Sequence, residues 1–418
     1  MKSWQEITHW AGFDWAKNNH EIVIVDQQGQ IVADFVFEHS LEGWQRMRKE
    51  VSGFAGLAVA IETNQGAAVD QLLQHGFIVY PVNPVAAASY RKRKVPSGTK
   101  TDHVDAWALA DALRVDGHGW KVLPPTDPLT QQLRILCKDE VTLIEQRTAL
   151  VNQLQQALSE YYPAALEAFD DWTHAFTWDF VIKFPTPQAL VKAGKRRWEK
   201  FMHTHKLWRP ETTEKRLKVF AQADQFKASD AIVCAKSQLA LSLAKLLRTL
   251  QQQLDLYREQ IEELFKDHPD HDIFGSLPGA KQVLGPRLLA AVGTDPERYG
   301  GHQALQCLAG TAPVSYESGQ MHKVQVRRAC DKFLRHTVHL WANCFRKTSA
   351  WGQTYYEKKR ADGMSHACAL RCLGQRLLKI LFKMISTKTP YDAELHAKNQ
   401  KKHGSWVIAL TTNNEVSA

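Results

Sequence analysis

Four acidic residues stand where a sheet would bring them together. Asp14 ends the first expected strand, Glu62 ends a buried apolar strand, and Asp102 and Asp105 begin an expected helix. Acids at strand ends gather at the carboxyl edge of an α/β sheet, and residues three apart on a helix share a face. Converging carboxylates repel one another unless a cation neutralises them, and Mg²⁺ prefers such oxygen ligands. Two such ions suit phosphodiester chemistry. Taken singly, Asp102 is better explained as a helix cap and Asp14 as a turn residue, and only the set of acids together favours a metal site.

The elements around these acids predict a mixed α/β domain. Apolar runs and alternation indicate strands at 10–15, 21–25, 31–37, 56–62 and 77–82, and helical spacing indicates helices at 41–51, 67–75 and 102–114. Three strands in a meander, followed by strand–helix alternation, are typical of a ribonuclease-H-like sheet, although the pattern alone does not separate this fold from other α/β folds.

The rest of the chain reads as mostly helical. Apolar residues at helical spacing predict long helices over about 127–161 and 230–267, long enough for a coiled-coil stalk. Between them, a segment rich in Pro, Trp and Lys at about 171–229 reads as an inserted module. The expected division is 1–125 for the acidic α/β domain, 126–270 for the stalk with its insert, 271–395 for a helical domain and 396–418 for a tail.

The tryptophans of the inserted segment have two readings. Trp172, Trp178, Trp198 and Trp208 are interleaved with a basic run at 195–197. Aromatic rings beside cations stack on unpaired bases in nucleic-acid-binding proteins. The same rings also serve as the core of a small helical module, and we expect that role for most of them.

The charge distribution favours a polyanionic partner. The chain has 53 Lys and Arg against 44 Asp and Glu, a formal net charge of +9. Residues 84–100 carry five basic residues and no acid, and residues 319–388 carry 15 basic residues against three acids. Concentrated basic segments are the electrostatic footprint of nucleic-acid binding, although a solvated basic surface would look the same.

Composition excludes several other classes. No apolar run is long enough for a transmembrane helix, and residues 1–6 lack the apolar stretch of a signal peptide. Seven scattered cysteines fit neither a disulfide framework nor a zinc site. We therefore expect a cytoplasmic protein with no membrane partner.

Several short motifs resemble one protein family. Its N-terminal pattern is found at 12–14, 61–63 and 83–84, and then in the run from Lys100 to Ala106. In the second half, 277–279 with 290–293, 308–313 and 316–319 match further motifs. Residues 328–335 match only in part, because a usual glycine is missing. These motifs resemble those of the IS110-type transposases, whose N-terminal domain is RuvC-like with an acidic DEDD tetrad.

The resemblance implies a specific chemistry. It makes the chain a DNA transposase, a site-specific recombinase, in which Asp14, Glu62, Asp102 and Asp105 bind two Mg²⁺ ions. Ser318 would be the nucleophile that becomes joined to DNA. From the residues alone, Ser318 followed by glycine is a common turn, and a nearby serine, Ser315, is its rival.

The resemblance also implies partners. A structured guide RNA would bridge donor and target DNA, and the protein would work as a homo-oligomer, a dimer or tetramer, near the nucleoid. The basic residues expected to contact nucleic acid are Arg91, Lys92, Arg93, Lys94, Lys100, Lys323, Arg327, Arg328, Lys332 and Arg335. Two alternatives stay open: a RuvC-type metal-dependent endonuclease that cuts by water attack, and a non-catalytic nucleic-acid-binding remnant of an element.

Overall fold

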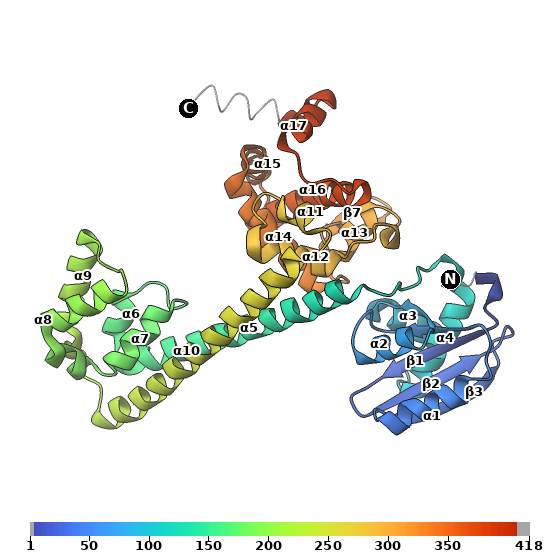
Figure 1. Cartoon of the computed structure of the whole chain (residues 1–418), viewed down its shortest axis with the longest axis horizontal. Coiled ribbons are helices and arrows are strands. Elements are labelled where there is room, and N and C mark those ends of the chain that lie inside the picture. The colour runs from blue at the N-terminus through green and yellow to red at the C-terminus, as the bar shows by residue number, and fades with distance from the viewer. Residues whose placement is uncertain (1–3, 408–418) are drawn as a thin grey trace. The chain divides into compact units, whose positions relative to one another are not determined.

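The N-terminal part of the chain forms a five-stranded mixed sheet (Figure 1). The computed structural model describes residues 4–407. The strands are β1 (His9–Trp15), β2 (Asn19–Val25), β3 (Ile31–Glu38), β4 (Leu57–Ile61) and β5 (Ile78–Pro81), in the order β3-β2-β1-β4-β5. The first three pair antiparallel, and β4 and β5 run parallel to β1. The predicted meander and the strand–helix alternation are both confirmed.

The side chains of β1 point alternately into two hydrophobic cores, one on each face of the sheet, and helices cover both cores. Ala11 and Phe13 pack in a core with α1 (Leu41–Val51) and α2 (Ala67–Gln74). Trp10 belongs to the opposite core, which contains residues of α3 (Pro84–Lys94) and α4 (Asp102–Asp116). Because successive side chains point to opposite faces of a sheet, Gly12 and Asp14 share the α4 side with Trp10.

A glycine lets α4 lie close to the central strand. A Cβ built on Gly12 would lie 1.8 Å from the carbonyl oxygen of Ala106 and 2.7 Å from the amide nitrogen of Ala110. No side chain fits there, so Gly12 and the two alanines set the approach of α4 to β1. The first turn of α4 lies one turn before Ala106, and Thr101 caps this helix by accepting from the Val104 amide.

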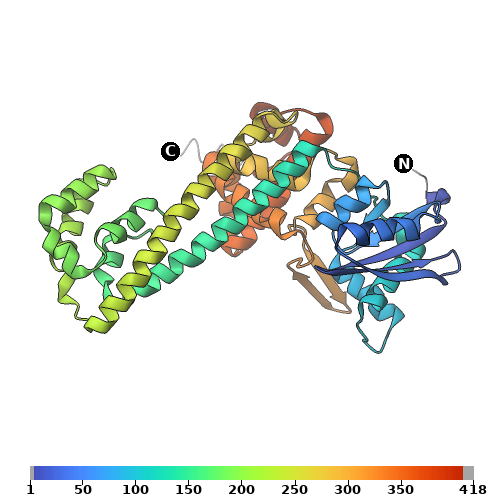
Figure 2. The same ribbon diagram turned by 60° about the horizontal axis from the view of Figure 1, so that its bottom comes forward.

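The chain divides into two compact units, and the N-terminal sheet belongs to the first. The second unit comprises Leu129–Gly275 and Ala280–Ala291 and contains two long antiparallel helices. They are α5 (Pro128–Tyr161) and α10 (Asp230–Lys266), close to the predicted bounds, and they lie side by side in Figures 1 and 2. Glu160 pairs with Lys236 at 2.8 Å, and buried Glu140 pairs with Arg258 at 3.1 Å. Helix α12 (Lys281–Val292) joins this pair, because Arg287 approaches Glu140 to 2.7 Å.

Four helices connect the two long ones: α6 (Pro163–Ala168), α7 (Ala175–Lys183), α8 (Pro187–Thr204) and α9 (Pro210–Ala221). Trp172, Trp178 and Trp198 are buried in their core, and each indole N–H donates to a backbone carbonyl. The prediction that most of these rings form the core is confirmed. Trp208 differs, since it is 41% exposed. The connecting helices begin at Pro163, earlier in the chain than the segment expected at about 171–229.

The C-terminal part is mostly helical, as predicted, but it also contains a hairpin that the sequence did not indicate. Strands β6 (Val314–Ser318) and β7 (Met321–Gln325) pair antiparallel. The helices are α13 (His302–Leu308), α14 (Lys332–Thr348), α15 (Ala350–Ala361), α16 (His366–Thr387) and α17 (Ala393–Lys402), whereas α11 (His271–Gly275) belongs to the unit of the long helices. Short 3₁₀ helices occur at Trp4–Glu6, Gly117–Gly119, Ala223–Gln225 and Glu297–Tyr299.

Residues 408–418 of the predicted tail lie outside the described residues. Over 4–407, no helix has both the length and the apolar character that crossing a membrane requires.

Candidate active site

Asp14 and Glu62 lie at adjacent positions on neighbouring strands. Phe13 of β1 pairs with Ile61 of parallel β4, so the next residue of each chain segment is an acid. Ala58 and Ala60 pack in the core on the α4 side, and the alternation of β4 therefore directs Glu62 to the same side as Asp14. The sheet thus presents two carboxylates toward the first turn of α4.

That first turn carries Asp102 and Asp105. Burial raises the pKa of Asp14 from 3.8 to about 7, with further contributions from the charges of Asp102, Asp105, Glu62 and Glu21. The pKa of Glu62 is also raised, chiefly by burial and then by Asp105. All four predicted acids are therefore close enough for their charges to interact.

Glu21 is a fifth acid that sequence reasoning missed. It lies directly opposite Asp14 in the β1–β2 register. His103, which stands between the acids of α4, approaches Glu21 with 3.1 Å between Nδ1 and Oε1. The signal was present in the sequence: a connection of three residues after Trp15 fixes the antiparallel register and brings Glu21 opposite Asp14.

One arginine partly neutralises this cluster. Arg91 Nη1 lies 2.6 Å from Asp105 Oδ1, and the Asp105 side chain is 9% exposed. Within 4–407, no group of three or more His, Cys, Asp or Glu residues has ligand atoms arranged to hold a metal ion. The donor set nevertheless suits a hard divalent cation, because the carboxylates outnumber the cationic groups that face them.

The basic run 91–94 has intramolecular partners that the sequence did not reveal. Lys94 lies 2.7 Å from Asp111, a carboxylate that is 3% exposed and also pairs with Arg93 and Arg114. The run forms the end of α3, and these pairs attach it to α4. Lys92 is exposed, as is Lys100 beyond the helix, so these two remain available to an external anion.

Ser318 ends strand β6 next to a tight turn. It pairs with Met321 across the two-residue connection, and Gly319 has φ +56, the sign that the first central residue of a type II′ turn requires. By strand alternation Ser318 shares a face with Tyr316 and Lys323, whereas Ser315 lies on the other face with Glu317 and His322. The two candidate serines, Ser318 and Ser315, therefore lie on opposite faces of the hairpin.

The remaining basic residues of this region divide into two groups. Arg327 donates to the carbonyl of Ala312, and Arg335 donates to the carbonyl of Arg327. Lys323, Arg328 and Lys332 are exposed. The first two arginines therefore hold local backbone, and the other three present their charge to solvent.

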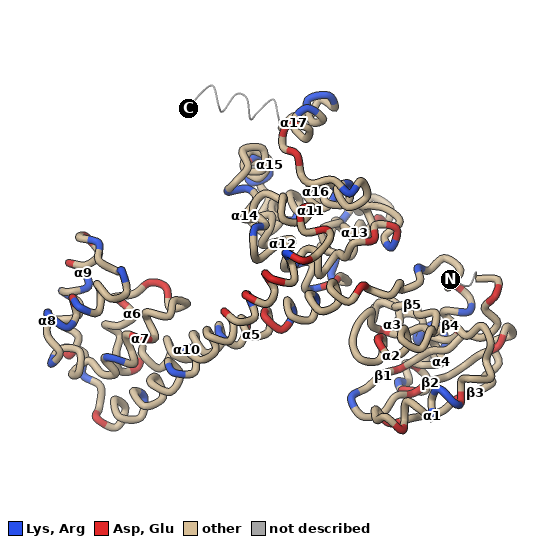
Figure 3. Tube along the Cα trace, viewed as in Figure 1, with Lys and Arg blue, Asp and Glu red and all other residues tan. Residues whose placement is uncertain are grey.

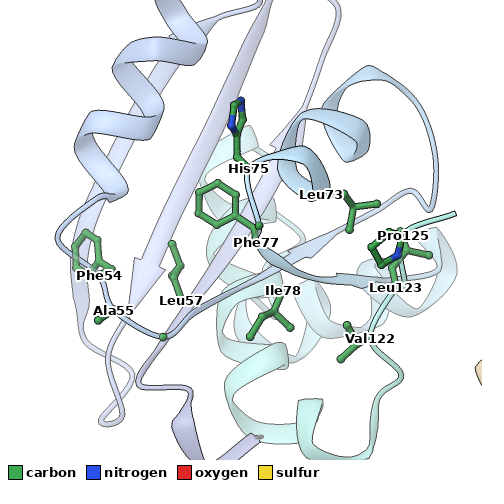
Figure 4. Close-up of a pocket in the computed structure, with 12 residues that line it drawn as sticks. Phe54, Ala55, Leu57, Leu73, His75, Phe77, Ile78, Val122, Leu123 and Pro125 are labelled. Carbon is green, nitrogen blue, oxygen red and sulfur yellow. The ribbon is translucent and has the colours of Figure 1, made fainter. Parts of the chain in front are cut away.

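A separate apolar pocket of about 390 Å³ lies at the other end of β4 (Figure 4). Phe54, Leu73, Phe77 and Leu123 line it, beside Leu57 at the beginning of the strand. Glu62 follows the opposite end of that strand, so this pocket is not part of the acidic cluster.

Comparisons with known proteins agree with this arrangement of the chain. Residues 11–163, which contain all four acids, match a family model described as a transposase. Residues 271–357, which contain Ser318, match the model described as the transposase IS116/IS110/IS902 family. Both matches assign the protein to the transposases.

Similar proteins extend over almost the whole chain. The chain is 30% identical over 402 residues to the IS117 mini-circle protein of Streptomyces coelicolor, and the alignment covers 94% of this chain and 97% of that protein. It is 28% identical over 397 residues to a 42 kDa protein of the insertion element IS900 of Mycobacterium paratuberculosis, covering 91% and 96%. The chain belongs to the IS116/IS110/IS902 family of transposases.

Proposed function

We propose that this transposase cuts and rejoins DNA at the ends of an insertion element, with a divalent-metal site at Asp14, Glu62, Asp102 and Asp105 and a nucleophile at Ser318. The observation that carries the proposal is the convergence of the four acids on the α4 side of the sheet, within the segment that matches the transposase model. The strand order β3-β2-β1-β4-β5 is consistent with a RuvC-like, ribonuclease-H-like domain.

The four acids would hold Mg²⁺, with two ions in the working site. Such ions activate a nucleophile and stabilise the leaving oxygen of a phosphodiester. Arg91 keeps Asp105 oriented, and Glu21 orients His103 beside the cluster. These two contacts would position the cluster, and neither Arg91 nor Glu21 belongs to the proposed ligand set.

Attack by Ser318 would replace a phosphodiester bond of the DNA with a bond between the serine and the same phosphate. Its Oγ forms a bond to phosphorus and loses its proton, while the bond from phosphorus to one DNA oxygen breaks and that strand leaves as a hydroxyl. The phosphoserine link conserves the bond energy, so a DNA hydroxyl can attack it later and release the serine without ATP. The position of Ser318 next to an exposed turn, with Lys323 on the same face, supports access by a DNA strand.

The proposed partners are DNA at the element ends and target, a structured guide RNA, and further copies of this chain in a dimer or tetramer. The exposed residues Lys92, Lys100, Lys323, Arg328 and Lys332 are the basic positions most available to phosphates. In this scheme residues 1–125 supply the acids and 271–395 supply the serine, and the protein works at the nucleoid in the cytoplasm.

The test is a covalent adduct. Labelled element-end DNA is incubated with the protein, the proposed structured guide RNA and Mg²⁺, and is resolved by denaturing electrophoresis. Wild type and Ser315→Ala should form a protein–DNA adduct, and Ser318→Ala should form none while still binding DNA. An adduct lost in Ser315→Ala but kept in Ser318→Ala would move the nucleophile to Ser315. Normal cleavage with no adduct in wild type would favour an endonuclease that uses water.

A further inference from the structure

The helices that connect α5 and α10 carry a basic surface outside the acidic cluster and the hairpin. Residues 187–209 contain seven Lys or Arg and one acid, Glu199. All seven are exposed: Lys192, Lys195, Arg196, Arg197, Lys200, Lys206 and Arg209. Figure 3 shows blue segments, which mark Lys and Arg, around α8. Among the ion pairs of the described residues, only Lys195 is engaged, with Glu199 at 3.8 Å.

This pairing pattern differs from that of the run at 91–94. There, three of four basic residues hold buried or half-buried acids of α4. In α8 the cations face solvent, and the core beneath them is closed by Trp198, Phe201 and Met202. Their charge is therefore not needed to neutralise anything inside the module.

The backbone places some of these cations where they do not favour the helix. Gly194 has φ +73 and ψ +166, which breaks α8 into two segments. Lys195, Arg196 and Arg197 therefore occupy the first turn of the second segment, where the helix dipole disfavours positive charge. Stability alone does not account for three cations at this end, and an anionic ligand would.

A stripe of side chains leads from this turn to an exposed aromatic ring. Arg196, Lys200 and His203 follow the i, i+4, i+7 spacing of one helix face, opposite the buried Phe201 and Met202. His203 stacks on Trp208 with ring centroids 4.2 Å apart and an interplanar angle of 14°. The Trp208 ring remains 41% exposed, so it offers a flat surface at the end of the basic stripe.

We infer that this surface, the α8 stripe, binds unpaired nucleotides: Arg196 and Lys200 contact phosphates, and Trp208, backed by His203, stacks on a base. A row of cations beside an exposed aromatic ring is what single-stranded nucleic acids fit, because every base has a face that can stack. Duplex DNA offers its phosphates but keeps its bases stacked on one another. The inference does not depend on the metal site or on Ser318.

Full-length protein can be titrated against fluorescent oligo-uridine, oligo-thymidine and duplex DNA of equal length over a range of salt concentrations. Arg196→Gln with Lys200→Gln should weaken binding of the single strands about tenfold, and should reduce the slope of log affinity against log salt by about 1.4, at about 0.7 per lost phosphate contact. Trp208→Ala should weaken single-strand binding by a similar factor without changing the salt slope, and Trp208→Phe should restore most of it.

The matched control is Lys227→Gln with Lys245→Gln, which removes two exposed charges of the same unit outside the stripe. It should bind as wild type. A preference of wild type for oligo-uridine over oligo-thymidine would identify RNA as the source of the unpaired nucleotides. Equal losses in the stripe and control variants, or wild-type binding by Trp208→Ala, would overturn the inference. So would an equal effect of Trp208→Ala on duplex binding.

Discussion

At the residue scale, the acidic cluster holds carboxylates so close together that their charges repel one another in the folded protein. Asp14 is half-buried and faces the charges of four other carboxylates, so its ionised form is disfavoured. Residues selected for stability alone would not be arranged in this way, whereas a site that receives a cation requires it.

Asp14→Asn should therefore stabilise the protein in a chelating buffer at pH 8, because the change removes a repelled charge while keeping the shape of the side chain. We expect a higher melting temperature than wild type, together with loss of strand cleavage. Glu145→Gln, which neutralises an exposed acid of α5 outside the cluster, is a control that should change neither property. A lower melting temperature for Asp14→Asn would show that its charge is satisfied within the fold.

Because His20 is buried in the folded protein, it should make the free energy of unfolding depend on pH. It is buried, its Nδ1 accepts from the Ala16 amide, and its Nε2 lies 2.8 Å from His39. Burial and then His39 lower its pKa from 6.5 to about 4. Between pH 6.5 and about pH 4 the unfolded chain binds more protons at His20 than the folded chain does. The free energy of unfolding therefore rises with pH across this range and decreases as the pH falls through it.

The full effect approaches about 3 kcal/mol at pH 4, at about 1.4 kcal/mol per pKa unit. Urea unfolding at pH 6.5 and pH 4.5 measures it. His20→Gln should have a lower stability at pH 6.5 but a smaller decrease on acidification. The same decrease in both proteins would assign the pH dependence to other groups.

At the element scale, the position of α4 determines the site. Gly12→Ala should push this helix away from β1, since the new methyl group would meet the Ala106 carbonyl at 1.8 Å. We expect a loss of about 3 kcal/mol in unfolding free energy, at the upper end for overpacking, and a loss of cleavage. Gly53→Ala is the matched control, because its Cβ would meet nothing within 4 Å. Similar melting temperatures for the two variants would contradict this role of Gly12.

Helix α3 supports α4 through its basic end. Lys94→Gln removes a cation 2.7 Å from the buried Asp111 carboxylate and should cost about 1–3 kcal/mol in unfolding free energy. Lys92→Gln, on the exposed side of the same run, should leave stability within about 0.5 kcal/mol of wild type. Thermal melts of the two variants make the comparison, and equal melting temperatures would show that the Lys94 pair contributes nothing.

Much of this local structure could be predicted from the sequence. Strand β1, which contains Asp14, and strand β4, which ends one residue before Glu62, are largely apolar, and Thr101 gives a clear start to α4. The role of Arg91 and Lys94 could not be predicted, because their partners, Asp105 and Asp111, come from another helix and depend on how α3 packs. The β6–β7 hairpin was missed for another reason: its residues are mostly exposed, the alternation in β6 is limited to Val314 and Tyr316, and β7 has no regular alternation.

At the scale of the whole molecule, the sequence relationship assigns the chain to a transposase family, and the central claim is that its four predicted acids form one divalent-metal site. The individual variants Asp14→Asn, Glu62→Gln, Asp102→Asn and Asp105→Asn address this claim together, since each removes one ligand charge with little change in shape. Asp105→Asn also leaves Arg91 without its charged partner, so its melting temperature is measured alongside its activity.

The most direct measurement is Mg²⁺-dependent strand cleavage of element-end DNA by wild type and these four variants, with Mg²⁺ binding followed by calorimetry on the same preparations. We predict that all four variants bind nucleic acid, lose Mg²⁺ binding at the site and cut no DNA, while Glu145→Gln behaves as wild type. Cleavage at the wild-type rate by any two of the four folded variants in Mg²⁺ would contradict the metal site.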